Sequence, residues 1–442
     1  MKFFVLVLFF ATNLYVFCQP EFDINYINDY RKSFTIQPIS YPTLSGDSLQ
    51  IIVPFRFSLN FLSFEKSGEQ QKLSCNFLVE FVFRDSSGII RKSMNFRDTL
   101  FFPFADKELI NTKNYLSLIT TKLPLQNFSL EVSLFDKERF KVKSIKTEIR
   151  FRRIGNFLIF QPIFASRTNN SNNFALSLLN NALDFTKKDK VIIIPTFSID
   201  GLGNLNFQIK SNNIKTNQMN WQKDIAFDVR TVLLSTSHFN YLLDTERVVI
   251  DFEHKAMVGS KSPLNFLLID FPEKFAYLQN YSLNIYHSIL RDTLNLDFRI
   301  HWENPPISLR SIHYAIELMY YILTDEKYNE ILSAKKDQQW QLFFEEWKKF
   351  DTDTTTLFNE AMDEYYKRVD FAFLNFQTVG EEDGAKSERG KIFILFGKPS
   401  DVQRVIEKNG IVREEWIYYR LKKKFTFEMK FKKFELINIT EL

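Results

Sequence analysis

The sequence predicts a mainly β protein with an α-helical segment ahead of a small C-terminal β region. Short runs rich in Val, Ile, Phe and Thr recur between residues 48 and 303, and several of them alternate apolar and polar residues with period two. Apolar residues then follow helical spacing from residue 309 to 376, and strand-like runs return from residue 391. The chain has 442 residues, 45% hydrophobic and 25% charged, which is enough for about three ordinary globular units.

The first predicted unit is an antiparallel β-sandwich-like domain at residues 19–153. Residues 21–45 are polar with scattered aromatic residues, and we expect an irregular lead-in there. Strand-like runs separated by polar turns follow at residues 48–59, 73–85, 88–98, 120–136 and 141–153. Short strands at this spacing are typical of a β-sandwich.

A second β-rich domain in tandem is predicted at residues 154–306. Its strand-like runs lie at residues 156–164, 173–181, 190–199, 204–211, 224–234, 247–255, 264–271 and 293–303. The prolines at 305 and 306 break any strand and close the unit. The two predicted β domains have similar strand-like runs, but their sequences show no repeat that can be aligned.

A helical region is predicted at residues 307–376. Three segments, at residues 309–334, 337–351 and 357–376, place apolar residues on one helical face each. Short connections between them favour a compact three-helix arrangement.

The last predicted region, at residues 377–442, completes a small α+β domain. A polar turn from Asp383 to Gly390 leads into the apolar run 391–396, which we expect to be a strand ended by a Gly-x-Pro turn at Gly397 and Pro399. After a polar excursion at 400–409, strands are expected at 413–421 and 425–431. In the second of these, the apolar residues at alternate positions, Phe431 included, are expected to face the core.

The first 18 residues predict export. A positive start at Met1 and Lys2 precedes an apolar stretch from Phe3 to Val16, which is too short for a membrane span but typical of a signal peptide. Cleavage after Cys18 removes residues 1–18, whereas the alternative makes Cys18 a lipidated first residue. We therefore expect a periplasmic, outer membrane-associated or extracellular protein, with membrane association only if Cys18 is lipidated.

Several classes of site lack support in the sequence. The net charge of +4 is too small to indicate nucleic acid as a partner. Neither a G-x-G-x-x-G nor a Walker pattern occurs, so no nucleotide cofactor is expected. The five histidines have no zinc-ligand spacing, and Cys75 lies in a strand-like run as a small buried residue, so no metal site is expected.

Motifs in the C-terminal third suggest a family. They lie in a fixed order at Trp347–Asp351, Tyr366–Val369, Arg389–Ile392, Phe396–Pro399 and Trp416–Tyr419. Over residues 310–420 the chain resembles the GWxTD domain found in envelope proteins of Bacteroidetes and related bacteria. The resemblance implies a small α+β domain that follows β-rich segments, and it brings no assigned activity.

The sequence departs from the family signature at its centre. Gly384 is kept, but Ala385, Ser387 and Glu388 stand where the family has Trp, Thr and Asp. Lys398 replaces the first proline of the later turn. If the family's tryptophan and aspartate form a site, this chain has altered it.

Two interpretations of this segment remain open. The candidate motif or binding residues are Gly384, Ser387, Glu388, Arg389, Gly390, Gly397, Pro399 and Trp416. One interpretation is an exported hydrolase or carbohydrate-binding protein with its site at residues 383–401, beside exposed aromatic residues at Trp416 and Tyr418. The other, which we favour, is a non-catalytic envelope module in which these residues make turn and ion-pair contacts, and whose partner is an unknown envelope protein or glycan.

Overall fold

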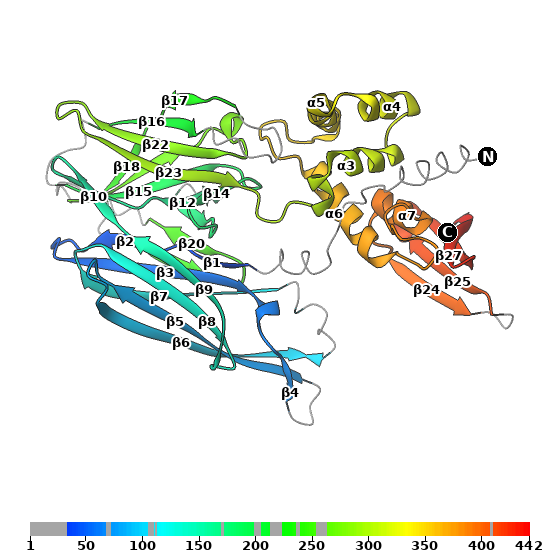
Figure 1. The fold of residues 1–442 in the computed structure, drawn as a ribbon, viewed down its shortest axis with the longest axis horizontal. Coiled ribbons are helices and arrows are strands. Elements are labelled where there is room, and N and C mark those ends of the chain that lie inside the picture. The colour runs from blue at the N-terminus through cyan, green and yellow to red at the C-terminus, as the bar shows by residue number, and fades with distance from the viewer. Residues whose placement is uncertain are drawn as a thin grey trace, which may run out of the picture. The chain divides into compact units, whose positions relative to one another are not determined.

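Antiparallel sheets dominate the computed structural model, and α-helices gather in the C-terminal third (Figure 1). The structure describes residues 33–67, 72–104, 110, 113–168, 172–198, 205–212, 223–235, 239–252, 263–406 and 410–442. The predicted signal peptide at 1–18 lies outside these residues, as do His238 and His254. The mainly β prediction with a helical C-terminal segment is confirmed.

Backbone contacts divide the chain into two compact units. The β unit comprises the described residues up to 304 together with 353–358, and the C-terminal unit comprises 305–352 and 359–442. Both of the predicted β domains, 19–153 and 154–306, contribute to the β unit. The predicted helical region and the C-terminal β region contribute to the C-terminal unit.

The first sheet of the β unit is centred on one long strand. Its members are β1 (Phe34–Ile36), β2 (Ile39–Pro42), β3 (Ser48–Ser58) and β7 (Asn114–Pro124). Both β1 and β2 pair with the same side of β3, so the irregular lead-in predicted at 21–45 is wrong for these residues. The break between them lies opposite Pro54, which has no N–H to donate, while the Gln37 N–H donates to the Pro54 carbonyl at 3.2 Å.

A second sheet packs on the first through aromatic side chains. It contains β4 (Glu65–Ser67), β5 (Lys72–Arg84), β6 (Ile90–Pro103), β8 (Phe128–Asp136) and β9 (Phe140–Ile149). Phe55 and Phe57 of β3 meet Phe77 and Phe81 of β5 in the core between the two sheets. Cys75 is buried in the same core, as its sequence context predicts.

A nine-stranded sheet and a five-stranded sheet complete the β unit. The former contains β10 (Phe151–Ile154), β11 (Phe157–Phe160), β12 (Ile163–Arg167), β13 (Asn173–Leu176), β15 (Lys190–Phe197), β18 (Val232–Ser235), β19 (Asn240–Leu243), β20 (Val248–Asp251) and β21 (Leu264–Asp270). The latter contains β14 (Ala182–Asp184), β16 (Leu205–Asn212), β17 (Ala226–Asp228), β22 (Asn280–His287) and β23 (Thr293–His301).

The central strand of the first sheet, β3, is buried on both faces. Ile51 and Val53 of β3 pack into the core shared with the second sheet, whereas Ile52 packs against the nine-stranded sheet. Alternate side chains of a strand point to opposite faces, so one strand serves two cores. This shared layer joins the segments predicted as two β domains (Figure 1).

The C-terminal unit begins with helices. They are α3 (Ile312–Leu318), α4 (Asp325–Ser333), α5 (Lys336–Trp347) and α6 (Glu360–Asn375). The segment 309–334, predicted as one helix, contains both α3 and α4, because the Thr324 side chain accepts a hydrogen bond from the Lys327 N–H and so starts a new helix. No helix in the described part of the chain is long and apolar enough to span a membrane.

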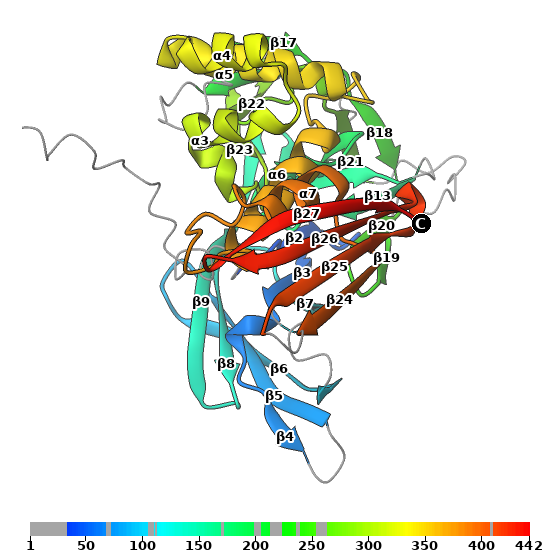
Figure 2. The same ribbon diagram turned by 90° about the vertical axis from the view of Figure 1, so that its right-hand side faces the viewer.

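Four antiparallel strands end the chain, in the order β24 (Asp401–Ile406), β25 (Val412–Tyr418), β26 (Lys423–Lys430) and β27 (Lys433–Glu441). Figure 2 shows α6 and α7 (Glu388–Phe396) beside this sheet. The polar segment at 400–409, which was not predicted to be a strand, contains β24. Phe431, predicted to face the core, is 90% exposed, because Phe431 and Lys432 form the two-residue turn between β26 and β27.

Candidate functional site

Residues Asp383–Gly390, which include the first residues of α7, carry the altered family signature and are called the signature turn below. It does not lead into a strand. Residues 391–396, predicted as a strand, lie in α7, so that prediction is wrong. Ser387 is the N-cap of this helix: its hydroxyl accepts a hydrogen bond from the Gly390 N–H at 2.9 Å and donates one to the Gly384 carbonyl at 2.7 Å. A short apolar run fits a buried strand or a buried helix equally well, and here the cap decides.

The two glycines of the signature turn allow backbones to approach closely. A Cβ on Gly384 would lie 2.3 Å from the Ala372 carbonyl oxygen of α6, and a Cβ on Gly390 would lie 2.0 Å from the Gly384 carbonyl oxygen. Neither glycine has a positive φ angle, so backbone conformation is not what requires a glycine at these positions. Glycine is required because α6, the turn and α7 lie too close together to leave room for a Cβ.

Gly397 and Pro399 serve the end of α7. Gly397 has a φ of 78°, a conformation that favours glycine at the end of a helix, and its N–H donates to the Phe393 carbonyl at 2.7 Å. The Tyr418 hydroxyl donates to the Gly397 carbonyl at 2.8 Å. Pro399 follows in the connection to β24. The Gly-x-Pro segment therefore ends an element as predicted, but the element is a helix.

The start of the signature turn is held by α3. The Tyr314 hydroxyl donates to the Asp383 carboxylate, with both oxygens 3.1 Å away, and the Ala385 N–H donates to the same group at 3.0 Å. Burial raises the pKa of the Asp383 carboxyl above its usual range. Ala385, at the position of the family tryptophan, is fully buried, and its carbonyl accepts from the Tyr321 hydroxyl.

A buried ion pair anchors α7 to the sheet. The Arg389 guanidinium lies 3.5 Å from the Glu414 carboxylate, and the same carboxylate accepts a 2.6 Å hydrogen bond from the Trp416 indole N–H. Arg389 also covers the Phe434 ring at 4.0 Å. Burial lowers the pKa of the Arg389 guanidinium. Its Nε atom makes no hydrogen bond with any described residue.

The aromatic residues beside the turn are not exposed. Trp416 is 2% exposed and Tyr418 is 4% exposed, so the prediction that they form an exposed surface is wrong. Both lie under α7, where Trp416 packs against Phe376 and Phe393. These side chains of β25 are buried because α7 covers this part of the sheet.

Glu388 is the exposed carboxylate of the signature turn, and it also accepts a hydrogen bond from the backbone of the C-terminal unit. Its Oε2 atom accepts from the Leu436 N–H of β27 at 2.7 Å. The Ser387 hydroxyl is bonded on both sides by backbone groups and has no base beside it. Within the described residues, no group of three His, Cys, Asp or Glu side chains is placed to hold a metal ion. The arrangement can brace a helix against a sheet, and it lacks an activated nucleophile.

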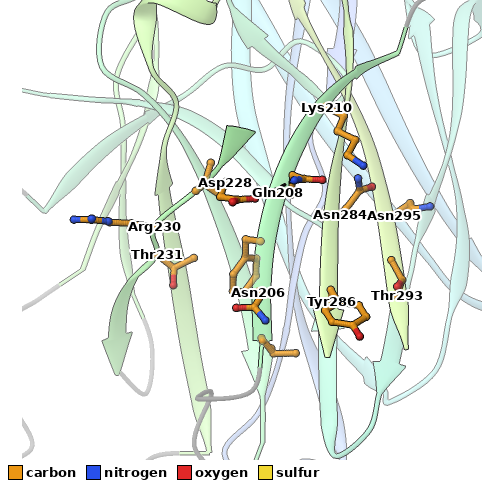
Figure 3. Close-up of a pocket in the computed structure, with 13 residues that line it drawn as sticks. Asn206, Gln208, Lys210, Asp228, Arg230, Thr231, Asn284, Tyr286, Thr293 and Asn295 are labelled. Atoms are coloured by element: carbon orange, nitrogen blue, oxygen red, sulfur yellow. Dashed lines mark hydrogen bonds between the residues drawn. The ribbon is translucent and has the colours of Figure 1, made fainter. Parts of the chain in front are cut away.

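A polar concavity lies elsewhere, on the outer face of the five-stranded sheet in the β unit (Figure 3). We call it the amide hollow, after the six uncharged polar residues of β16, β22 and β23 that line it: Asn206, Gln208, Asn284, Tyr286, Thr293 and Asn295. Its volume is about 870 Å³. No motif in the sequence points to it. The signal that was present is the alternation of Asn206, Gln208 and Lys210 with Leu205, Phe207 and Ile209.

Residues 298–440 match the family model of the GWxTD domain. The match begins in β23, runs through all the helices of the C-terminal unit and ends in β27. It contains the segment 310–420, where the resemblance was predicted. No curated protein matches the chain with significant similarity. The chain is therefore a GWxTD domain-containing protein, with a β-rich region ahead of that domain.

Proposed function

We propose that this chain is an exported, non-catalytic cell-envelope protein that acts as a structural or protein-interaction module. One observation carries the non-catalytic part of the proposal. The polar side chains of the signature turn bond to groups of the C-terminal unit itself, as Ser387 does to Gly384 and Gly390, and Arg389 to Glu414. A general acid, a base or a nucleophile has to reach the substrate, and these groups are buried.

The sequence of residues 1–18 supports the export part of the proposal. A positive start, an apolar stretch and a break at Cys18–Pro20 are typical of a signal peptide. Analysis of the N-terminus of the protein purified from its own cells distinguishes the two outcomes. Cleavage after Cys18 gives a protein that begins at Gln19, whereas lipidation leaves a modified Cys18 at the start.

The second candidate, an exported hydrolase or carbohydrate-binding protein with its site at residues 383–401, has less support. It relied on exposed aromatic residues, but Trp416 and Tyr418 are buried. It also needs free carboxylates, whereas Asp383 accepts hydrogen bonds from Tyr314 and Ala385, and Glu388 accepts one from Leu436.

A turnover assay tests the non-catalytic claim. We expect the full mature chain to leave ester, peptide and glycoside substrates unchanged at micromolar enzyme concentration. Glu388→Gln is the informative variant, because the amide oxygen still accepts from the Leu436 N–H while the charge is lost. Turnover of a defined substrate that Glu388→Gln abolishes, with unchanged thermal stability, overturns the proposal.

A binding assay tests the interaction claim. The tagged mature chain is recovered from the envelope fraction of its own cells, and co-purifying proteins are identified by mass spectrometry. The proposal expects a defined partner that also binds the purified full chain in a direct titration. Absence of any such partner, together with free diffusion of the chain in the exported fraction, contradicts the proposed role.

A further inference from the structure

We propose that the amide hollow binds a neutral oligosaccharide. This site lies in the β unit and is independent of the signature turn. Sugar binding there and the proposed role of the GWxTD domain can each fail without the other. The polar groups of the hollow come from three neighbouring strands.

The strand register places the lining side chains in two rows. Asn206, Tyr286 and Thr293 are directly opposite one another across β16, β22 and β23. Two residues further along the strands, Gln208, Asn284 and Asn295 form a second row. Neighbours within a row are about 5 Å apart, and the rows are about 7 Å apart. Figure 3 shows the rows side by side on one face of the sheet.

Much of the hydrogen-bonding capacity of these rows is unused. Among the described residues, the side chains of Asn206, Tyr286 and Asn295 have no hydrogen-bond partner. Gln208 donates to Asp228 at 3.0 Å, which leaves its carbonyl oxygen free to accept, and Asn284 accepts from Ser282 at 3.4 Å, which leaves its two N–H donors free. The rows therefore offer donors and acceptors together, as a surface that recognises hydroxyl groups requires.

The charges of the hollow favour a neutral ligand. Lys210 and Arg230 lie on opposite sides of it in Figure 3, so they do not converge on one anion. Asp228 balances one of the two positive charges. A phosphate or carboxylate site would instead bring two cations or several backbone N–H groups to one point.

An apolar component accompanies the amides. Tyr286, a member of the first row, is 38% exposed, so its ring is open to a ligand. Leu205 and Phe207 also line the hollow but are at most 8% exposed. A sugar ring has C–H faces as well as hydroxyl groups, so a ring face can pack on Tyr286 while its hydroxyls bond to the amides. The volume of about 870 Å³ lies within the range of small-molecule sites, which suits a short oligosaccharide.

The geometry fits a sugar better than an added peptide strand. At the hollow, a peptide strand would have to pair with the backbone edge of β16, where β17 already pairs with residues 208–210 and the Val229 N–H donates to the Phe207 carbonyl. The polar rows lie on the face of the sheet, where side chains and not backbone groups meet a ligand. An oligosaccharide carries many hydroxyl groups and no charge, so several of its hydroxyls can bond to the side chains of such a face at once.

Calorimetric titration of the full chain tests the inference. The probes are three neutral hexasaccharides, with β-1,4-glucose, α-1,4-glucose and β-1,4-N-acetylglucosamine units, and one anionic probe, hexagalacturonate. We expect at least one neutral probe to bind. We expect the Asn206→Ala/Asn295→Ala variant to bind it at least about tenfold more weakly, since two hydrogen bonds are lost.

The controls separate binding from folding. Asn95→Ala removes an exposed amide on β6, outside the hollow, and should leave affinity unchanged. Should the double variant unfold, Asn295→Asp keeps the side-chain shape, removes its donors and should still weaken binding. The inference is overturned if no neutral probe binds, if only hexagalacturonate binds, or if the folded variants bind as the unaltered chain does. It is also overturned if the double variant turns an oligomer into a monomer without any sugar binding, because the hollow is then a contact between copies.

Discussion

The signature turn and the amide hollow are both rich in polar side chains, but they use them in opposite ways. In the signature turn, Ser387, Arg389 and Asp383 are bonded to groups of the same unit and are largely buried. In the hollow, Asn206 and Asn295 are exposed and unbonded within the described residues. The motif that identifies the family is therefore an internal brace, and the surface with unused hydrogen-bonding groups lies where no motif points.

Removal of the buried cation should have the largest effect on the brace. Arg389→Ala leaves the Glu414 carboxylate buried without its partner, and we expect a loss of about 3–5 kcal/mol in the free energy of unfolding of the C-terminal unit. Denaturant unfolding measures it. Arg404→Ala, on exposed β24, is the matched control and should cost little. If Arg389→Ala cost as little as an exposed cation does, the Arg389–Glu414 pair would not stabilise the unit.

The close approach at Gly390 gives the next largest effect. Gly390→Ala places a Cβ against the Gly384 carbonyl oxygen, so α7 must shift, at a cost of about 3 kcal/mol. Gly410→Ala is the control in the same unit. It has open space and a φ of 81°, so it should cost only about 1 kcal/mol through backbone strain. A reversed order in the unfolding curves would contradict the proposed role of Gly390.

A gain in stability is expected at the turn between β26 and β27. Phe431 and Lys432 have φ angles of 48° and 66°, which are unfavourable for residues with a Cβ. Replacing them by Asn and Gly should raise the free energy of unfolding by about 1–2 kcal/mol, and it removes an exposed phenylalanine. Thermal unfolding measures the change. A loss of stability would indicate that the Phe431 ring makes a contact that stabilises the unit.

The smallest expected effect is a pH dependence of the free energy of unfolding, which comes from Asp383 at the start of the signature turn. Burial raises the pKa of Asp383 in the folded state, so its protonation favours folding. This contribution is fully present below the unfolded-state pKa and is lost as the pH rises through the folded-state pKa.

Asp383→Asn isolates that contribution. The amide keeps an acceptor for the Tyr314 hydroxyl or the Ala385 N–H but does not titrate. Relative to this variant, the unaltered chain should lose stability as the pH rises above the ordinary Asp range. Parallel stability curves for the two proteins between pH 3 and pH 8 would mean that the Asp383 carboxyl ionises as easily in the fold as in the unfolded chain.

Local periodicity predicted most of the strands and the helices α5 and α6. It failed at residues 391–396, because a five-residue apolar core fits either element and the Ser387 cap decided for a helix. The burial of Trp416 followed from that error, since the helix covers the sheet. Local alternation marks the polar face of β16 but not the hollow, because β16 and β23 contribute side chains about 90 residues apart in the chain.

Stability and affinity for a neutral hexasaccharide, measured together on two variants, separate an internal brace from a binding surface. We expect Arg389→Lys to lower the free energy of unfolding and to leave the affinity unchanged. We expect the opposite of Asn206→Ala/Asn295→Ala, which should keep the stability and lose at least about tenfold in affinity. If Arg389→Lys instead abolishes binding in a folded chain while the double variant binds normally, the roles assigned to the signature turn and the amide hollow are wrong.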